Sequence, residues 1–354
     1  MSGTDSMITP RAVLIWLRCV CFSVVVILVV GGITRLTGSG LSMVDWRPVM
    51  GVLPPLSETE WEEVFDQYKA FPEYQKVNIG MNIEGFKAIF FWEYLHRILG
   101  RIVGLLCLLP YLWFLWRGRL GKSMNIKGLC LVILVGSQGL MGWYMVKSGL
   151  VQNPEVSHFR LASHLGLAFA VFGLAWWMIL GLSKNEPVND GSLGFRSIAI
   201  GLLLLLCLQI IYGAFTSGMK AGYGYNTYPK MGDDWVPEAL FGLSPFWQNL
   251  VSDKFSVQFI HRWLGSALTL STICMGWFAI RSGSLNRLQT RRLYCLIALV
   301  LTQFSLGVLT LLFLVNLPVL LPAVHQLLAL FLFAAFLAFV HSLGKSPTSV
   351  PRVA

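Results

Sequence analysis

The chain has 354 residues, of which 55% are hydrophobic and 12% charged, and its net charge is +10. These proportions exclude an ordinary soluble domain and predict an all-α polytopic membrane protein. Nucleic-acid binding is also excluded as the reason for the positive charge. The basic residues lie in short loops between apolar runs, where they orient a membrane protein.

Eight apolar runs are each close to the ~20 residues that cross a bilayer as a helix. They cover residues 14–34, 94–116, 127–147, 160–182, 196–217, 257–280, 292–315 and 319–341. No signal-peptide cleavage site follows the first run, which we therefore expect to be a retained helix. The aromatic-rich loops 35–92 and 218–256 are expected to be ordered at the membrane interface, with a short amphipathic helix over 58–65 after Ser57.

Basic residues without neighbouring acids cluster in two loops and set the expected orientation. These residues are Arg117, Arg119, Lys122 and Lys127 after the second run, and Arg281, Arg287, Arg291 and Arg292 after the sixth. Such loops stay in the cytoplasm, so both termini are predicted to be cytoplasmic. The seven cysteines all lie in or beside apolar runs, which argues against loop disulfides and zinc sites and favours inert thiols.

An internal repeat organises the chain into halves. The pattern His-Arg-x-Leu-Gly occurs at 96–100 and again at 261–265, an offset of 165. The same offset relates Gln138 and Gly142 to Gln303 and Gly307, and an offset of 182 relates Gly31 and Thr34 to Gly213 and Thr216. With four runs each, halves 1–190 and 191–354 would share one topology, which predicts two parallel-repeat four-helix bundles.

Four histidines follow this repeat and lie at the expected outer ends of their helices: His96, His164, His261 and His325. Two imidazoles at one depth of a four-helix bundle suit a bis-histidine haem. Structural histidines bonded to loop carbonyls and a copper or zinc site are the alternatives. His158 and His341 have no repeat partner and are expected to have structural roles.

The residues around the first histidine of each half differ in charge. Glu93 precedes His96 by three residues, whereas Gln258 holds the equivalent position before His261. One half thus carries a titratable carboxylate, which favours proton-coupled chemistry there and electron transfer in the other half. A structural Glu93, favoured near a helix start, is the alternative. The arginines that follow the histidines could bind haem propionates or lipid headgroups.

The motif-bearing stretches together resemble the haem A synthase family over nearly the whole chain. They are residues 31–42, 93–100, 138–150 and 158–166, the pair His261-Arg262 and the pair His325-Gln326. The resemblance implies a bacterial inner-membrane enzyme that oxidises the pyrroline methyl of haem O to a formyl group, with haem O synthase as an expected partner. It also implies haem B as cofactor on His261 and His325 near Arg262, with His96, His164 and Glu93 at the substrate haem in the first half.

Loop 35–92 lacks the cysteine pair that some members of this family carry, so the chain resembles the cysteine-free branch. A thiol relay there is excluded, and the electron donor or acceptor stays open. The competing interpretations are a di-haem electron carrier of the cytochrome b type and a transporter. The remaining expected partners are membrane lipid and further copies of the chain in a homo-oligomer, with no nucleic acid.

Overall fold

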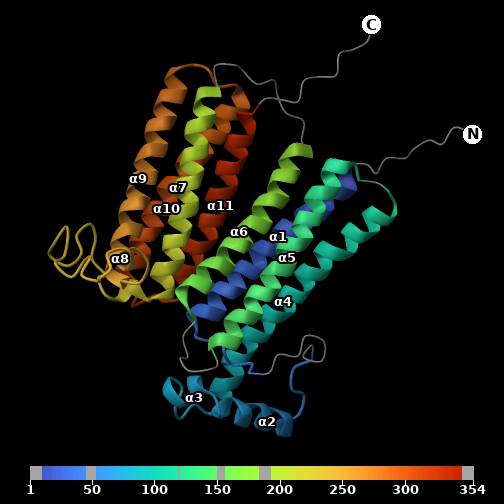
Figure 1. Cartoon of the computed structure of the whole chain (residues 1–354), viewed down its shortest axis with the longest axis vertical. Helices are drawn as coiled ribbons and strands as arrows, with labels where there is room; N and C mark the ends of the chain where they lie inside the picture. Colours follow the sequence, from blue (N-terminus) through green and yellow to red (C-terminus); the bar gives the residue numbers. More distant parts are fainter. Residues whose placement is uncertain (1–9, 45–52, 119, 150–155, 183–192, 345–354) are drawn as a thin grey trace, which may run out of the picture. The chain divides into compact units, whose positions relative to one another are not determined.

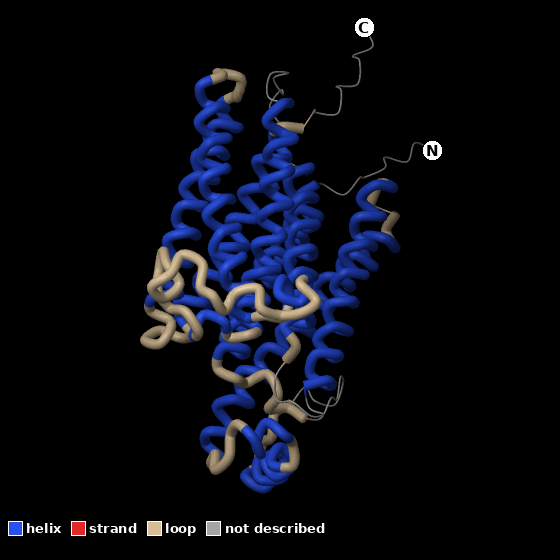
Figure 2. Tube along the Cα trace, turned by 60° about the vertical axis from the view of Figure 1, so that its left-hand side comes forward, coloured by secondary structure: helices blue, strands red, loops and turns tan. Residues whose placement is uncertain are grey.

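The computed structural model describes residues 10–44, 53–118, 120–149, 156–182 and 193–344. Arg119, Leu150 and residues 45–52 of the first long loop, which entered the predictions above, lie outside these ranges. Within the described residues the chain is helical, with one isolated bridge between Met231 and Asp234 and no strand (Figure 2).

Eight of the helices are long and apolar enough to cross a membrane, which confirms the predicted all-α membrane protein. They are α1 (Pro10–Leu36), α4 (Ile83–Trp116), α5 (Lys122–Gly149), α6 (His158–Leu182), α7 (Leu193–Gly218), α9 (Lys254–Arg281), α10 (Arg287–Leu312) and α11 (Leu320–Ser342). The shorter helices lie in the loops: α2 (Glu58–Lys69), α3 (Pro72–Lys76), the 3-10 turn Ala221–Tyr223 and α8 (Trp247–Val251). All seven cysteines lie in these long helices and are free thiols.

The chain forms two compact units, Met1–Phe172 and Gly173–Ala354. In the first unit α4 packs against both α1 and α5 (Figure 1). Two hydrogen bonds fix α1 on α4: Trp16 Nε1 donates to Leu106 O at 3.0 Å and Thr34 Oγ1 donates to Trp92 O at 3.1 Å. In the second unit α7, α9, α10 and α11 each pack against two of the others and close a four-helix bundle.

Helix α4 begins eleven residues before the predicted span 94–116, because its first turns are stabilised by contacts with the preceding loop. Asn82 caps the helix by accepting from Gly85 N at 2.9 Å. Phe86 then stacks on Phe65 and Tyr68 of α2, with ring centres 5.0 and 5.1 Å apart. The predicted helix over 58–65 is confirmed as α2, which is longer at its carboxyl end.

A buried carboxyl lies among the short helices of this loop. Tyr68 Oη donates to Glu73 Oε2 at 3.3 Å and accepts from Asn78 Nδ2 at 2.7 Å. Burial raises the pKa of Glu73 to about 7; the charge of Glu93 adds to the rise and the Tyr68 hydroxyl opposes it. The docking of α2 and α3 on α4 therefore favours a protonated Glu73.

Candidate functional site: two histidine pairs

In the first unit, α4 and α6 bring His96 and His164 together, with ring centres 6.5 Å apart and planes inclined by 65°. Gly31 of α1 makes room for the His96 ring, since a Cβ there would lie 2.7 Å from His96 Cε1. Gly142 of α5 lies beside His164, since a Cβ there would lie 3.4 Å from His164 Cε1. Gln138, one turn before Gly142, places its Nε2 3.3 Å from His164 Nε2.

The second unit repeats these neighbours around His261 of α9 and His325 of α11. A Cβ at Gly213 of α7 would lie 3.1 Å from His261 Cε1, and one at Gly307 of α10 would lie 2.9 Å from His325 Cε1. Gln303 places its Nε2 3.4 Å from His325 Nε2 and also donates to His325 O at 3.1 Å. The absence of a Cβ at each repeated glycine thus leaves space for a repeated histidine ring, which explains why the two motifs recur together.

The four imidazoles share one further feature. The Nδ1 atoms of His96, His164, His261 and His325 are buried and have no hydrogen-bond partner. Burying a polar atom without a partner costs ~1–3 kcal/mol, so each ring would be stabilised by a partner from outside the chain. An iron between two imidazoles holds their ring centres about 6 Å apart, given metal–nitrogen bonds of about 2 Å. The His96–His164 spacing of 6.5 Å fits a haem, and no cluster of three His, Cys, Asp or Glu side chains exists among the described residues.

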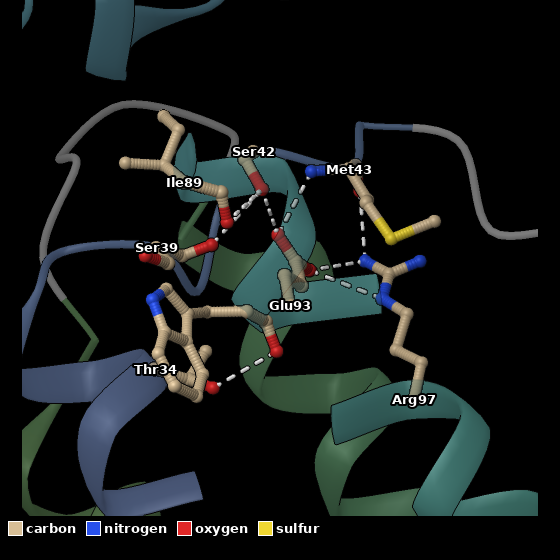
Figure 3. Close-up of polar contacts among 8 residues, drawn as sticks. Thr34, Ser39, Ser42, Met43, Ile89, Glu93 and Arg97 are labelled. Atoms are coloured by element: carbon tan, nitrogen blue, oxygen red, sulfur yellow. Dashed lines mark hydrogen bonds and ion pairs between the residues drawn. The ribbon is translucent and has the colours of Figure 1, made fainter. Parts of the chain in front are cut away.

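Glu93 is buried, with 3% of its side chain exposed, and four hydrogen bonds hold its carboxylate. Oε2 accepts from Ser42 Oγ and from Met43 N, both at 2.8 Å. Oε1 accepts from Arg97 through Nε at 3.1 Å and through Nη2 (Figure 3). The carboxylate is therefore directed at the loop after α1 and at Arg97, and the lone pairs that a general base would use are occupied in this arrangement.

The equivalent residues of the second unit bind the loop after α7. Gln258 Nε2 and Arg262 Nη2 both donate to Tyr225 O at 2.7 Å. Arg262 Nη1 donates to Thr227 O at 2.7 Å and to Lys230 O at 3.2 Å. The Nε of Arg262 is buried without a partner, so this guanidinium keeps one donor for an anionic group such as a haem propionate.

The other histidines lie outside the pairs. The His158 ring contacts Phe159, with centres 4.1 Å apart, and the His341 and Trp177 rings form a T-shaped pair with centres 4.8 Å apart. One neighbour was missed from the sequence. Gln209 donates to His261 O at 3.0 Å, and no motif marks it, because the equivalent residue of the first half is an isoleucine.

Comparison with known proteins identifies the family of the chain. Residues 14–337 match the family described as cytochrome oxidase assembly protein. A haem A synthase of Nitrosospira multiformis is 42% identical over 340 residues, covering 95% of this chain and 94% of that protein. One of Rhodospirillum centenum is 41% identical over 346 residues, covering 98% and 91%. One of Flavobacterium johnsoniae is 42% identical over 339 residues, covering 95% and 98%. The chain therefore belongs to this family of cytochrome oxidase assembly proteins.

Proposed function

We propose that the chain is a membrane-bound haem A synthase, an oxidoreductase that converts the pyrroline methyl of haem O to a formyl group. The observation that carries the proposal is the two histidine pairs, whose Nδ1 atoms have no hydrogen-bond partner, in a chain about 40% identical to haem A synthases. The test is coexpression with haem O synthase in cells that make no haem A. Haem A should appear among the extracted haems, and its absence would contradict the proposal.

We assign the cofactor, haem B, to His261 and His325. The support is the fit of both rings against glycines, the free Nδ1 atoms and the free Arg262 Nε beside the first ring. When bound, haem B supplies one-electron transfer. The residues of this chain hold it, orient its ligands and keep water from them. His261→Ala or His325→Ala should abolish stable haem B binding, whereas a normal low-spin haem spectrum in either variant would refute the assignment.

The substrate haem O is assigned to His96 and His164, with Glu93 contributing to the oxidation. The support is the ring spacing of 6.5 Å and the presence of a carboxylate in this half alone at the repeat-related position. Methyl oxidation removes electrons and protons, so the charged, hydrogen-bonded carboxylate of Glu93 favours this half as the place of the oxidation. The oxygen atom comes from water or dioxygen by successive hydroxylation.

The halves 1–190 and 191–354 are proposed to be parallel repeats, one for the substrate and one for the cofactor. The support is that contacts around each histidine pair recur at the offsets of the sequence repeat. We place the chain in the bacterial inner membrane with both termini in the cytoplasm, as the basic loops favour. A carboxyl-terminal reporter that is active only outside the cytoplasm would contradict this orientation.

The expected partners are haem O synthase, which supplies the substrate, and an electron donor or acceptor that the chain does not identify. A di-haem cytochrome b-type carrier is the second candidate, because both histidine pairs could hold a permanent haem. Acid extraction of haem from the purified protein separates the two. Haem B alone favours the carrier, whereas haem B with haem O or haem A favours the synthase.

A further inference from the structure

The segment that follows α1 is fastened to the turn of α4 that bears His96. We call residues 39–43 the first strap. Both backbone polar groups of Met43 are held: its N–H donates to Glu93 Oε2 at 2.8 Å, and its carbonyl accepts from Arg97 Nη2 at 2.8 Å. Ser42 Oγ adds a bond to Glu93 Oε2 at 2.8 Å (Figure 3). Arg97 and Glu93 expose 8% and 3% of their side chains, so solvent screens this ion pair little.

The segment that follows α7 is fastened in the same way to the turn of α9 that bears His261. We call residues 221–225 the second strap. Its Tyr225 carbonyl accepts from Gln258 Nε2 and Arg262 Nη2, both at 2.7 Å. Gly224 lies so close to Phe255 of α9 that a Cβ at this position would overlap the ring.

The two straps correspond by the sequence repeat. Met43 and Tyr225 are 182 residues apart, which is also the offset between the glycines of α1 and α7 that contact the histidines. The side chains that hold them, at positions 93 and 97 and at 258 and 262, are offset by 165, as are His96 and His261. The same backbone position is thus held by the same two helix positions in both units, although the bonding groups differ. An incidental loop contact would not recur in this way.

We propose that Glu93, Arg97, Gln258 and Arg262 are positioning residues that hold a strap over the first histidine of each pair and thereby enclose the haem bound there. This inference rests on the proposed function, because it takes the first site to bind haem O and the second haem B. Glu93 then contributes to oxidation by fixing the strap and Arg97, and not by taking a proton from the substrate. Its four donors support this assignment, since a base would have to lose one of them first.

The test measures strap opening separately from activity. Amide hydrogen exchange is followed in peptides covering residues 39–43 and 221–225 of the purified holoprotein, and haem O affinity by optical titration. Ser42→Ala and Arg97→Gln should speed exchange of the first strap about tenfold or more, since each removes a hydrogen bond to a charged group. Haem O affinity and haem A formation should fall with it, while haem B content stays normal.

Gln258→Ala is the complementary variant. It should speed amide exchange in the second strap and the transfer of haem B to apomyoglobin. Amide exchange in the first strap should stay as in the wild type. Two controls should match the wild type in every measurement. Lys87→Gln removes an exposed ion pair of α4 with Glu84, and Ser266→Ala removes a hydroxyl that bonds within α9 to Arg262 O.

The outcomes separate the strap from the alternatives. A Ser42→Ala protein with faster strap exchange but unchanged haem O affinity and haem A formation would overturn the proposal. Faster haem A formation in that variant would also overturn it, because a carboxylate freed of one donor acts better as a base. If Arg97→Gln lacks haem B and so has not folded, Ser42→Ala, which removes one oxygen atom, decides. If the wild type makes no haem A, the proposed function fails, and the exchange and haem-affinity results still decide the role of the straps.

Discussion

Gly307→Ala should weaken haem B binding by crowding His325. The new Cβ would lie 2.9 Å from Cε1 of the ring, whereas carbon atoms in contact prefer about 3.5–4.0 Å. The ring must therefore retreat by at least about 0.6 Å, more than the ~0.5 Å that a preorganised site tolerates. Gln303 opposes the retreat, because it holds the His325 carbonyl at 3.1 Å. Overpacking of this kind costs ~1–3 kcal/mol, which corresponds to about 5- to 150-fold weaker binding.

The assay is haem B content per protein after purification, with the low-spin optical spectrum and the rate of haem transfer to apomyoglobin. Gly201→Ala on α7 is the matched control, because a Cβ there meets open space, and Gly142→Ala at 3.4 Å should be tolerated. Alanine raises helix propensity by about 1 kcal/mol over glycine, so a loss cannot come from a weaker helix. Wild-type haem B content, spectrum and transfer rate in Gly307→Ala would refute the idea that the glycines seat the imidazoles.

Three further predictions concern carboxylates and thiols. Glu93→Gln should keep haem B but lower haem A formation about tenfold or more, because the hydrogen bonds to Arg97 lose the charge of the carboxylate. Chromatography of extracted haems measures both, and near-normal haem A would remove Glu93 from the functional residues. Because folding raises the pKa of Glu73 to about 7 from its ordinary 4.5, the docking of α2 and α3 should be strongest below about pH 4.5 and weaken as the pH rises to about 7. The rise corresponds to roughly 3 kcal/mol. Glu73→Gln should abolish the pH dependence of the amide protection factors in α2, and an unchanged dependence of these factors would exclude Glu73. Replacing all seven cysteines should preserve haem A formation, since loop 35–92 has none; loss of haem A at normal haem B content would contradict inert thiols.

The membrane helices could be predicted because each apolar run carries its own signal. The start of α4 could not, since residues 83–93 include Glu84, Lys87 and Glu93 and read as loop by hydropathy. Their helix is stabilised by aromatic rings from α2, about twenty residues away in sequence, and no local pattern encodes that packing. Tertiary contacts with the preceding loop therefore extend the helix beyond the span predicted from hydropathy.

The histidine pairs could also be predicted, because the repeat marks both members of each. What the repeat did not reveal is which glycine lies against which ring. Gly31 and His96 are on different helices, and the offsets of 182 and 165 that relate them to the second half differ because the second long loop is shorter. Their contact follows from the packing of α1 on α4, which places the glycine of one helix against the histidine of the other.

The charge difference between Glu93 and Gln258 has a local cause that lies in the straps. Ser42 and Gly224 are equivalent by the offset of 182, and only the serine carries a hydroxyl. The first strap presents two donors to position 93, the Ser42 hydroxyl and the Met43 N–H, and a carboxylate oxygen accepts both. The second strap presents the Tyr225 carbonyl to position 258, and an amide can donate to it. Glu93 thus accepts from a strap that offers donors, and Gln258 donates to a strap that offers an acceptor. A loss of activity in Glu93→Gln must therefore be compared with the loss in Ser42→Ala before it is taken as evidence that Glu93 is a base.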